Sequence, residues 1–251
     1  MSLQDKVVLI TGGTSGIGEA TAKLLAGQGA KVVVAGRRTE QGNAVVDAIQ
    51  SSGGEAFFVR TDVTQEEDVK NLVAETVQKY GRVDVAFNNA GVEGSGPVHE
   101  VSVEQYRHIF DINVLGVFLS MKYEVEQMLK QGSGVIINTS SILGQVAMPG
   151  ASVYNASKHA VEGMTKTAAL EYAQQGIRVN AVAPAATATD MIDRFAGKEG
   201  AGSRAQLAAL HPMNRLATVE EIAGAVAYLA SDAASFTTGI SLPVDGGFLA
   251  R

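Results

Sequence analysis

The sequence contains no cysteine, so disulfide bonds, a thiol nucleophile and a thiolate metal site are all excluded. Histidine is also scarce. The four histidines, His99, His108, His159 and His211, do not form the short His-x-x-x-His pair that places two imidazoles on one face of a metal-binding helix. We therefore expect no catalytic metal.

Basic residues are fewer than acidic ones: the chain has 20 lysines and arginines and 26 aspartates and glutamates. The net charge is therefore −6, and the isoelectric point is about 5.3. A protein that coats nucleic acid or an anionic membrane needs a basic face, so neither is an expected partner. The first apolar run, residues 7–10, is too short for a signal sequence. A cytoplasmic location is the default expectation.

Apolar residues are plentiful: they make up 46% of the chain against 18% charged residues, with a mean hydropathy of +0.10. Short β-branched runs alternate with helix-length segments. This alternation predicts an α/β protein whose parallel, doubly wound sheet forms the middle of three layers. The predicted strands are residues 6–11, 31–35, 56–60, 83–87, 135–139, 178–182 and 241–244.

We expect one domain over residues 1–251, because no linker or repeat divides the chain and candidate site residues run from Gly12 to Thr189. Residues 185–213 depart from the regular pattern, since glycines interrupt them while apolar residues give them one apolar side. The residues concerned are Gly197, Gly200, Gly202, Met191, Ile192, Phe195, Leu207, Leu210 and Met213. The segment is either a mobile lid over a site or a surface helix with ordinary packing.

A glycine-rich turn follows the first predicted strand and precedes a helical pattern. Gly12, Gly16 and Gly18 would permit tight turning and close backbone approach, and the free amides at the helix start would face an anion. Thr14 and Ser15 add hydroxyl donors. The turn lacks the Gly-Lys-Ser/Thr ending of a nucleotide-triphosphate loop, which argues against kinase or ATPase chemistry. It predicts a site for the pyrophosphate of a dinucleotide.

The second predicted strand leads into Gly36, Arg37 and Arg38, where an enzyme that prefers NAD usually has an acidic residue for the ribose hydroxyls. Arginines could instead bind the 2′-phosphate of NADP through charge-assisted hydrogen bonds. We therefore favour NADP as the cofactor and keep NAD as the alternative. The competing interpretation is that the two arginines are merely solvated.

Tyr154 and Lys158 are four residues apart in a helical pattern, which would place phenol and ammonium on one face. An ion pair at about 4 Å and an effective dielectric of about 20 is worth roughly 4 kcal/mol, or about three pK units. Lys158 is therefore expected to lower the pKa of Tyr154 and make a proton donor that works near neutrality. The alternative is a half-buried aromatic ring beside a solvated amine.

Three motifs together, residues 12–18, residues 88–91 (Asn-Asn-Ala-Gly) and Tyr154-x-x-x-Lys158, resemble the short-chain dehydrogenase/reductase family in order and spacing over essentially the whole chain. The resemblance implies a Rossmann-type fold, an NAD(P)-dependent enzyme acting on CH–OH or C=O groups, and a homotetramer. It also implies that Asp62 and Val63 would meet adenine, although Asp62 by itself suggests an ordinary helix cap. With the two arginines, the expected cofactor-binding residues are Gly12, Thr14, Ser15, Gly16, Ile17, Gly18, Arg37, Arg38, Asp62, Val63, Asn89, Ala90, Gly91, Tyr154, Lys158, Pro184, Thr187 and Thr189.

The same resemblance implies a catalytic tetrad of Asn113, Ser141, Tyr154 and Lys158. Ser141 would orient the substrate oxygen, with Ser140 as its nearest rival. Tyr154 would be the general acid or base. Lys158 would hold the nicotinamide ribose, and Asn113 would support a water-linked proton path to it.

One departure from the family pattern is Ala185, which follows Pro184 where the family usually has glycine, so the geometry of that turn is less certain. The expected activity is hydride transfer between NADP(H) and a ketone or secondary alcohol. A 3-oxoacyl thioester reductase and a sugar dehydrogenase remain alternatives. An acidic carrier protein would suit the cationic residues Arg194, Lys198, Arg204 and Arg215. A non-catalytic nucleotide-sensing or scaffold protein is the alternative of another class.

Overall fold

The computed structural model describes residues 3–192 and 200–250, and in this part of the chain seven parallel strands form one sheet. The strand order is β3-β2-β1-β4-β5-β6-β7. The bounds are β1 (Val7–Thr11), β2 (Lys31–Gly36), β3 (Glu55–Arg60), β4 (Val85–Asn88), β5 (Gly134–Thr139), β6 (Ile177–Pro184) and β7 (Ser241–Val244). The predicted parallel, doubly wound sheet is confirmed.

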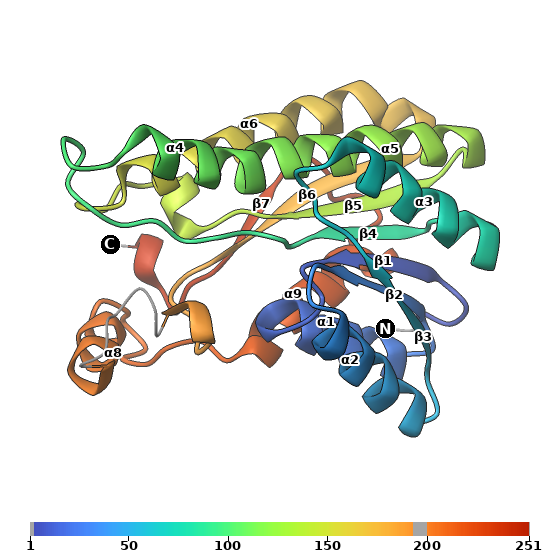
Figure 1. Cartoon of the computed structure of the whole chain (residues 1–251), viewed down its shortest axis with the longest axis horizontal. Helices are drawn as coiled ribbons and strands as arrows, with labels where there is room; N and C mark the ends of the chain where they lie inside the picture. Colours follow the sequence, from blue (N-terminus) through green and yellow to red (C-terminus); the bar gives the residue numbers. More distant parts are fainter. Residues whose placement is uncertain (1–2, 193–199, 251) are drawn as a thin grey trace.

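Helices cover both faces of the sheet and complete the three predicted layers (Figure 1). One face carries α1 (Gly16–Gly27), α2 (Thr39–Ser51) and α9 (Val219–Ala230). The other carries α3 (Glu66–Tyr80), α5 (Gly116–Gln131) and α6 (Ser152–Tyr172). Two further helices are α4 (Val103–Phe110), joined to α5 by the π-helical turn η1 (Asp111–Leu115), and α8 (Gly200–Ala209).

Alternate residues of the central strands contribute to opposite layers. Val8 and Ile10 of β1 belong to the apolar cluster that includes Leu25 of α1, whereas Leu9 between them belongs to the cluster that includes Met121 of α5. Because both faces of β1 are buried, apolar residues are favoured at every position of the strand rather than at every second one. This burial explains why uninterrupted apolar runs predicted the strands.

The predicted strand ends differ from the observed ones by one or two residues. The strand predicted at residues 83–87 begins at Val85, because the side chain of Gln131 bonds both the amide and the carbonyl of Val83. The strand predicted to end at residue 182 continues to Pro184, which is paired in register with Val244. Side-chain hydrogen bonds and edge pairing, which the apolar pattern does not report, set these limits.

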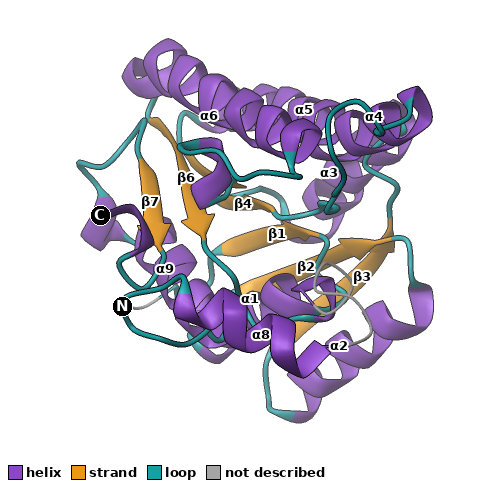
Figure 2. Ribbon diagram, turned by 90° about the vertical axis from the view of Figure 1, so that its left-hand side faces the viewer, coloured by secondary structure: helices purple, strands orange, loops and turns teal. Residues whose placement is uncertain are grey.

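The strand order reverses between β1 and β4, which lie side by side in the sheet (Figure 2). In open parallel sheets the ligand crevice forms outside the carboxyl ends of the strands at such a reversal. The segments that follow β1, β4, β5 and β6 therefore meet at one edge of the sheet. All four segments carry residues that the sequence motifs single out.

A polar cluster lies buried between the sheet and α5. Asn88 of β4 donates from Nδ2 to Oε2 of Glu124 (2.9 Å) and to Oδ1 of Asn138 (3.1 Å). Glu124 is only 1% exposed, and burial raises the pKa of its carboxyl to about 8, opposed by the hydrogen bond from Asn88. Oε1 of Glu124 and Oδ1 of Asn88 have no hydrogen-bond partner among the described residues. A proton on Glu124 would relieve this deficit at neutral pH.

Glu124→Gln should flatten the fall in stability that the parent protein shows as pH rises. The folded state holds the Glu124 proton up to about pH 8, whereas the unfolded carboxyl loses it near its ordinary pKa of 4.5. Between these values folding takes up a proton, so the free energy of unfolding falls by up to about 1.4 kcal/mol per pH unit. Urea unfolding between about pH 5.5 and 7.5 measures this slope, which the variant should lose.

Glu126→Gln is the matched control, because Glu126 lies on the same helix, is exposed and pairs with Lys130 (3.0 Å). That pairing lowers the pKa of Glu126, so its contribution is lost only as pH falls below the ordinary range. The control should keep the parental slope. Equal slopes for the parent and Glu124→Gln would show that Glu124 is already ionised in the folded protein.

Candidate active site

The glycine turn connects β1 to α1 and requires glycine at several positions. Gly12 and Gly16 have φ angles of +65° and +56°, a region that side chains disfavour. A Cβ on Gly12 would lie 2.8 Å from Cα of Ala90, and one on Gly18 would lie 2.3 Å from the carbonyl oxygen of Gly12. The turn therefore packs against the segment after β4 with no room for side chains at these two positions.

The amino end of α1 faces the sheet edge without a side-chain cap. Ser15 is the N-cap residue, but its hydroxyl makes no capping hydrogen bond and instead accepts from Nη2 of Arg38 (2.6 Å). The same guanidinium nitrogen donates to Oγ1 of Thr14 (3.0 Å). Amides at a helix start, two hydroxyls and a guanidinium are the donors that bind phosphate groups.

A large cleft of about 590 Å³ lies over this turn. It brings together thirteen of the residues that the sequence assigned to cofactor binding, from the segments after β1, β2, β3, β4 and β6. They are Gly12, Thr14, Ser15, Gly16, Ile17, Arg37, Arg38, Asp62, Val63, Asn89, Ala90, Gly91 and Thr189. Gly18 is buried beneath the turn rather than at the cleft surface. The volume and the donor set fit a dinucleotide.

Gly36 explains why the cleft has no acidic residue at the end of β2. A Cβ on Gly36 would lie 2.8 Å from Cγ2 of Thr14, so an aspartate there would have to push the Thr14 side chain aside. Arg37 and Arg38, the next two residues, are exposed and line the cleft. This end of the cleft therefore carries two cationic side chains, with Asp62 of the neighbouring strand end beside them.

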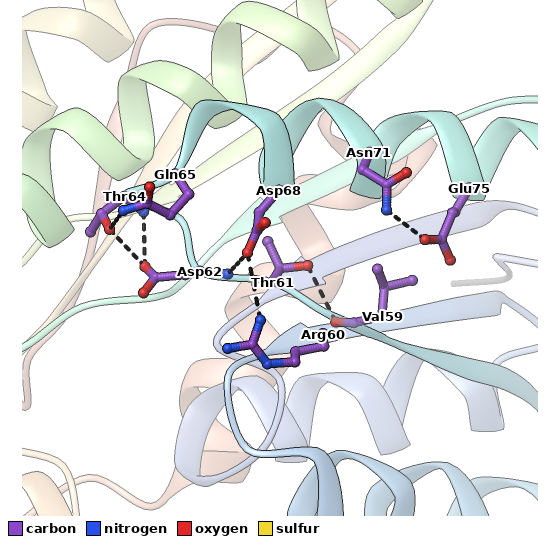
Figure 3. Close-up of polar contacts among 9 residues, drawn as sticks. All are labelled: Val59, Arg60, Thr61, Asp62, Thr64, Gln65, Asp68, Asn71 and Glu75. Carbon is purple, nitrogen blue, oxygen red and sulfur yellow. Dashed lines mark hydrogen bonds and ion pairs between the residues drawn. The ribbon is translucent and has the colours of Figure 1, made fainter.

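Asp62 shapes the loop after β3 (Figure 3). Its Oδ1 accepts from the amide (3.0 Å) and the hydroxyl (2.9 Å) of Thr64, and its own amide donates to Oδ2 of Asp68 (2.9 Å). Helix α3 begins later, with Gln65 as N-cap, so Asp62 makes a turn before the helix instead of capping it. The turn presents Asp62 to the cleft, and the structural and cofactor-binding interpretations are compatible.

Asn89 fixes the segment after β4 beside the glycine turn. Its Nδ2 donates to the carbonyl of Gly12 (3.1 Å), and its amide donates to Oγ1 of Thr11 (3.1 Å). A Cβ on Gly91 would lie 3.3 Å from Oδ1 of Asn113 and 3.7 Å from Nζ of Lys158. The Asn-Asn-Ala-Gly motif thus links the cleft to the residues predicted to be catalytic.

Tyr154 and Lys158 share one face of α6, as their spacing predicted. Lys158 is 4% exposed, its Nζ donates to the carbonyl of Thr139 (2.8 Å), and this nitrogen lies 5.6 Å from the centre of the Tyr154 ring. The ammonium therefore packs near the ring and is held by the end of β5.

The expected direction of the Tyr154 pKa is wrong for this structure. Burial raises the pKa of Tyr154 to about 12, partly offset by the Ser141 hydroxyl, and the charge of Glu93 adds to the rise. Burial also lowers the pKa of Lys158 to about 8, against the effect of Glu162. Desolvation is the largest cause of the shift for both groups, and the ammonium bonds a carbonyl and not the phenol oxygen.

Asn113 lies in η1, where the backbone is π-helical, and is fully buried. Its Oδ1 accepts from the amide of Val92 (2.8 Å), and its Nδ2 donates to the carbonyl of Val92 (2.9 Å) and to Oγ of Ser157 (3.1 Å). Ser157 in turn donates to the carbonyl of Tyr154 (2.7 Å). Asn113 therefore ties the segment after β4 to the first turn of α6.

Ser141 is the N-cap of η2 (Ile142–Gly144), and its Oγ accepts from the amide of Leu143 (3.1 Å) and lies 3.4 Å from the carbonyl of Pro184. Its hydroxyl acts on the pKa of Tyr154, so the two side chains are neighbours. Ser140, the rival, has a buried hydroxyl with no hydrogen-bond partner among the described residues. Proximity to Tyr154 favours Ser141.

A second, smaller cavity of about 180 Å³ adjoins the cleft, because Ile17, Asn89, Gly91, Val92, Thr189 and Met191 line both. Ser141, Tyr154 and Lys158 line it together with Pro184 and Thr187. Much of the remaining wall is apolar. Those side chains are Ile142, Leu143, Met148, Ala185, Ala186, Ile192, Leu207, Leu210 and Phe248.

The sequence analysis missed two polar residues of this wall, Glu93 and His211. It also missed Phe248 and the apolar wall residues between positions 142 and 148. They come from loops and turns whose residues meet only after folding. Glu93 lies two residues after the end of the Asn-Asn-Ala-Gly motif, and that position was the one available signal.

The predicted lid is only partly described. Met191, Ile192, Leu207 and Leu210 line the small cavity, whereas the predicted lid residue Met213 is exposed and its amide bonds the carbonyl of Gly246 (3.1 Å). Phe195 and Gly197 lie outside the described residues. Mobility of this segment stays a prediction.

Ala185 does not disturb the turn after β6. Its amide donates to the carbonyl of Val244 (3.2 Å), so the pairing with β7 continues past Pro184. Among the described residues other than glycine, only Asp5 and Asn214 have positive φ angles, so position 185 does not require glycine.

The described part of the chain contains no group of three or more potential metal-ligating side chains. No helix in that part of the chain has both the length and the apolar character needed to cross a membrane.

Comparison with known proteins adds independent information. Residues 12–249 match the family described as enoyl-(acyl carrier protein) reductase. The chain is 48% identical to 2,5-dichloro-2,5-cyclohexadiene-1,4-diol dehydrogenase of Sphingobium indicum, over 99% of the chain and 98% of that protein. It is 44% identical to cyclohexanol dehydrogenase of an Acinetobacter species, over 98% and 96%. Its fold is similar to that of levodione reductase, with a TM-score of 0.97, 36% identity and 99% of both chains covered.

Proposed function

Because the chain belongs to the short-chain dehydrogenase/reductase family and is an oxidoreductase acting on CH–OH or C=O groups, we propose that it interconverts a secondary alcohol and a ketone on a six-membered carbon ring, with NADP(H) as cofactor. The observation that carries this proposal is the pair of joined cavities. The large cleft has phosphate-binding donors, and the small cavity has an apolar wall with Tyr154 and Ser141 in it.

In the proposed reaction, the bound nicotinamide supplies or accepts the hydride. The hydroxyls of Ser141 and Tyr154 bind the substrate oxygen. In reduction Tyr154 donates its proton to that oxygen, and in oxidation it removes the proton from the alcohol. The raised pKa of Tyr154, about 12, keeps the proton in place at neutral pH, which suits the acid role.

Lys158 and Asn113 support this proton transfer. Lys158 is expected to hold the nicotinamide ribose, with its ammonium placed by the carbonyl of Thr139. The side chain of Asn113 makes three hydrogen bonds to protein, which leaves one acceptor site on Oδ1 for a water of the proposed proton path. We assign Asn113 a positioning role, because its hydrogen bonds hold α6 and the loop at Val92 together.

Cofactor choice is expected to depend on Arg38. The 2′-phosphate of NADP would take the Arg38 guanidinium away from the hydroxyls of Thr14 and Ser15 and form stronger, charge-assisted bonds. Arg38→Ala should raise the KM for NADPH by ~10-fold or more and change the KM for NADH by much less. Initial rates with each cofactor measure both values.

Arg60→Ala is the control for this prediction. Arg60 ends the neighbouring strand β3, is exposed, pairs with Asp68 at 4.0 Å and does not line the cleft. Its replacement should leave both KM values close to those of the parent. A parent enzyme that works better with NADH than with NADPH would refute the assignment of the arginines.

The apolar wall of the small cavity favours ring alcohols over sugars, because an unpaired sugar hydroxyl pays a desolvation penalty against apolar side chains. A carrier protein would need a basic surface, yet Arg215 forms two hydrogen bonds to the carboxylate of Glu221 (2.8 and 2.6 Å). Arg194 and Lys198 lie outside the described residues. Turnover of cyclohexanol, a hexose and an acyl thioester in parallel tests the substrate class.

A further inference from the structure

His211 is the one histidine in the wall of the small cavity, among the described residues. It follows α8, is 4% exposed and packs against Phe248, with the two ring centres 5.5 Å apart. The Cβ of His211 is near Gly246, so the side chain packs against the turn after β7. The imidazole is therefore a fixed part of the wall.

The hydrogen bonding of the ring determines which nitrogen carries the proton. Nδ1 lies 2.8 Å from the carbonyl oxygen of Leu207. A carbonyl oxygen only accepts, so Nδ1 must donate, and in the neutral ring Nε2 then carries a lone pair. This assignment follows from the partner and not from an observed hydrogen.

Nε2 of His211 is buried and has no hydrogen-bond partner among the described residues. Neighbouring wall residues such as Leu207, Leu210 and Phe248 are apolar. A buried acceptor without a partner is unfavourable, so such an atom on a residue of the cavity wall calls for a donor from the ligand.

We propose that Nε2 of His211 accepts a hydrogen bond from a second hydroxyl group of the substrate, so that the preferred substrates are ring diols and hydroxyketones rather than simple ring alcohols. This inference rests on the proposed function. One hydroxyl or carbonyl of the ring meets Ser141 and Tyr154, and the other hydroxyl meets His211. Nε2 is covered in this structure, so the proposal requires a neighbouring side chain to move when the substrate enters.

Three ring alcohols of similar size can show whether the second group must donate a hydrogen bond to Nε2. 1,4-Cyclohexanediol carries a second donor, 4-methoxycyclohexanol carries only an acceptor there, and 4-methylcyclohexanol carries neither. The parent enzyme should oxidise the diol with the highest kcat/KM. The methoxy compound should resemble the methyl compound, because an ether oxygen cannot donate to Nε2.

Two variants distinguish the effect of Nε2 from the effect of the rest of the imidazole ring. In His211→Asn the amide can still donate to the carbonyl of Leu207, but nothing remains at the position of Nε2. In His211→Gln a polar atom can occupy that position. The ratio of kcat/KM for the diol to kcat/KM for the methyl compound should fall by ~10-fold or more in His211→Asn and recover in part in His211→Gln.

His159→Asn is the matched control. His159 has the same bond from Nδ1 to a carbonyl four residues earlier, Asn155 at 2.9 Å, but it is exposed and does not line the cavity. In this variant, the ratio of kcat/KM for the diol to kcat/KM for the methyl compound should equal that of the parent. Thermal melting checks that all variants fold.

Each outcome decides between the two proposals. A parent enzyme that oxidises none of the three alcohols with NADP⁺ or NAD⁺ overturns the proposed function and this inference with it. A parent enzyme that oxidises them, with parallel losses on diol and methyl compound in His211→Asn, overturns only the role of His211. An unchanged ratio in His211→Asn does the same.

Discussion

Tyr154→Phe should lower kcat/KM for alcohol oxidation by roughly 10²–10⁴-fold while the enzyme still binds NADP(H) with nearly parental affinity. The variant loses only the phenol oxygen that would exchange a proton with the substrate. The ring stays packed near Lys158 and the loop after β5, because its apolar contacts are unchanged. Steady-state rates and cofactor titration by fluorescence measure the two quantities separately.

Tyr172→Phe is the control, since Tyr172 ends the same helix and packs in the apolar core instead of lining either cavity. It should keep the parental kcat/KM. Full activity of Tyr154→Phe would instead favour catalysis by another group. Loss of cofactor binding along with turnover would point to a structural role.

Titration of the Tyr154 phenol should also determine how the activity of the parent enzyme depends on pH. Because burial raises the pKa of Tyr154 to about 12, the fraction of phenolate grows throughout the range in which the enzyme can be assayed. kcat/KM for oxidation should therefore rise with pH, by up to about tenfold per unit, and Tyr154→Phe should lose that rise. A flat profile in the parent would exclude a titrating Tyr154.

Gly18→Ala should be the most damaging small substitution in the glycine turn, with a loss of roughly 3 kcal/mol in stability or a dinucleotide affinity reduced ~100-fold. The added Cβ would lie 2.3 Å from the carbonyl oxygen of Gly12 and 2.7 Å from Nδ2 of Asn89. The first of these atoms is backbone, so it cannot turn aside. The variant must either move the glycine turn or break the bond from Asn89 to Gly12.

Gly27→Ala tests the same substitution at the other end of α1. A Cβ on Gly27 would have no atom within 4 Å, and its φ is not positive. Alanine is the better helix former, so this variant should be as stable as the parent or more so by up to about 1 kcal/mol. Thermal melting and NADPH titration of both variants measure stability and cofactor affinity. If Gly18→Ala and Gly27→Ala gave the same values, the glycine turn would be more adaptable than its packing indicates.

The fold could be predicted from sequence because its determinants are local or repeated. Buried parallel strands such as β1 favour an apolar residue at every position, and the glycine turn after β1 needs its glycines for backbone reasons. The strand ends were less predictable. They depend on partners distant in sequence, as with Val83 and the side chain of Gln131.

The candidate site was predictable where a motif carries it, and not where the wall is assembled from separate turns. The spacing of Tyr154 and Lys158 placed both on one face of α6, but the sequence does not reveal that Thr139 holds the ammonium. Nor does the spacing reveal that the phenol is desolvated, and this burial is the main reason why the expected direction of the Tyr154 pKa was wrong. His211 and Phe248 meet only because α8 and the chain end pack around the same space.

The π-helical turn at Asp111–Leu115 makes the position of the Asn113 side chain depend on the number of residues in this stretch. A wider turn contains one residue more than an α-helix would use over the same rise. Each residue of an α-helix adds about 100° of rotation, so removing one here would let the helix wind regularly and swing the Asn113 amide away from Val92 and Ser157. Deletions should therefore be tolerated far less in this stretch than in the exposed loops.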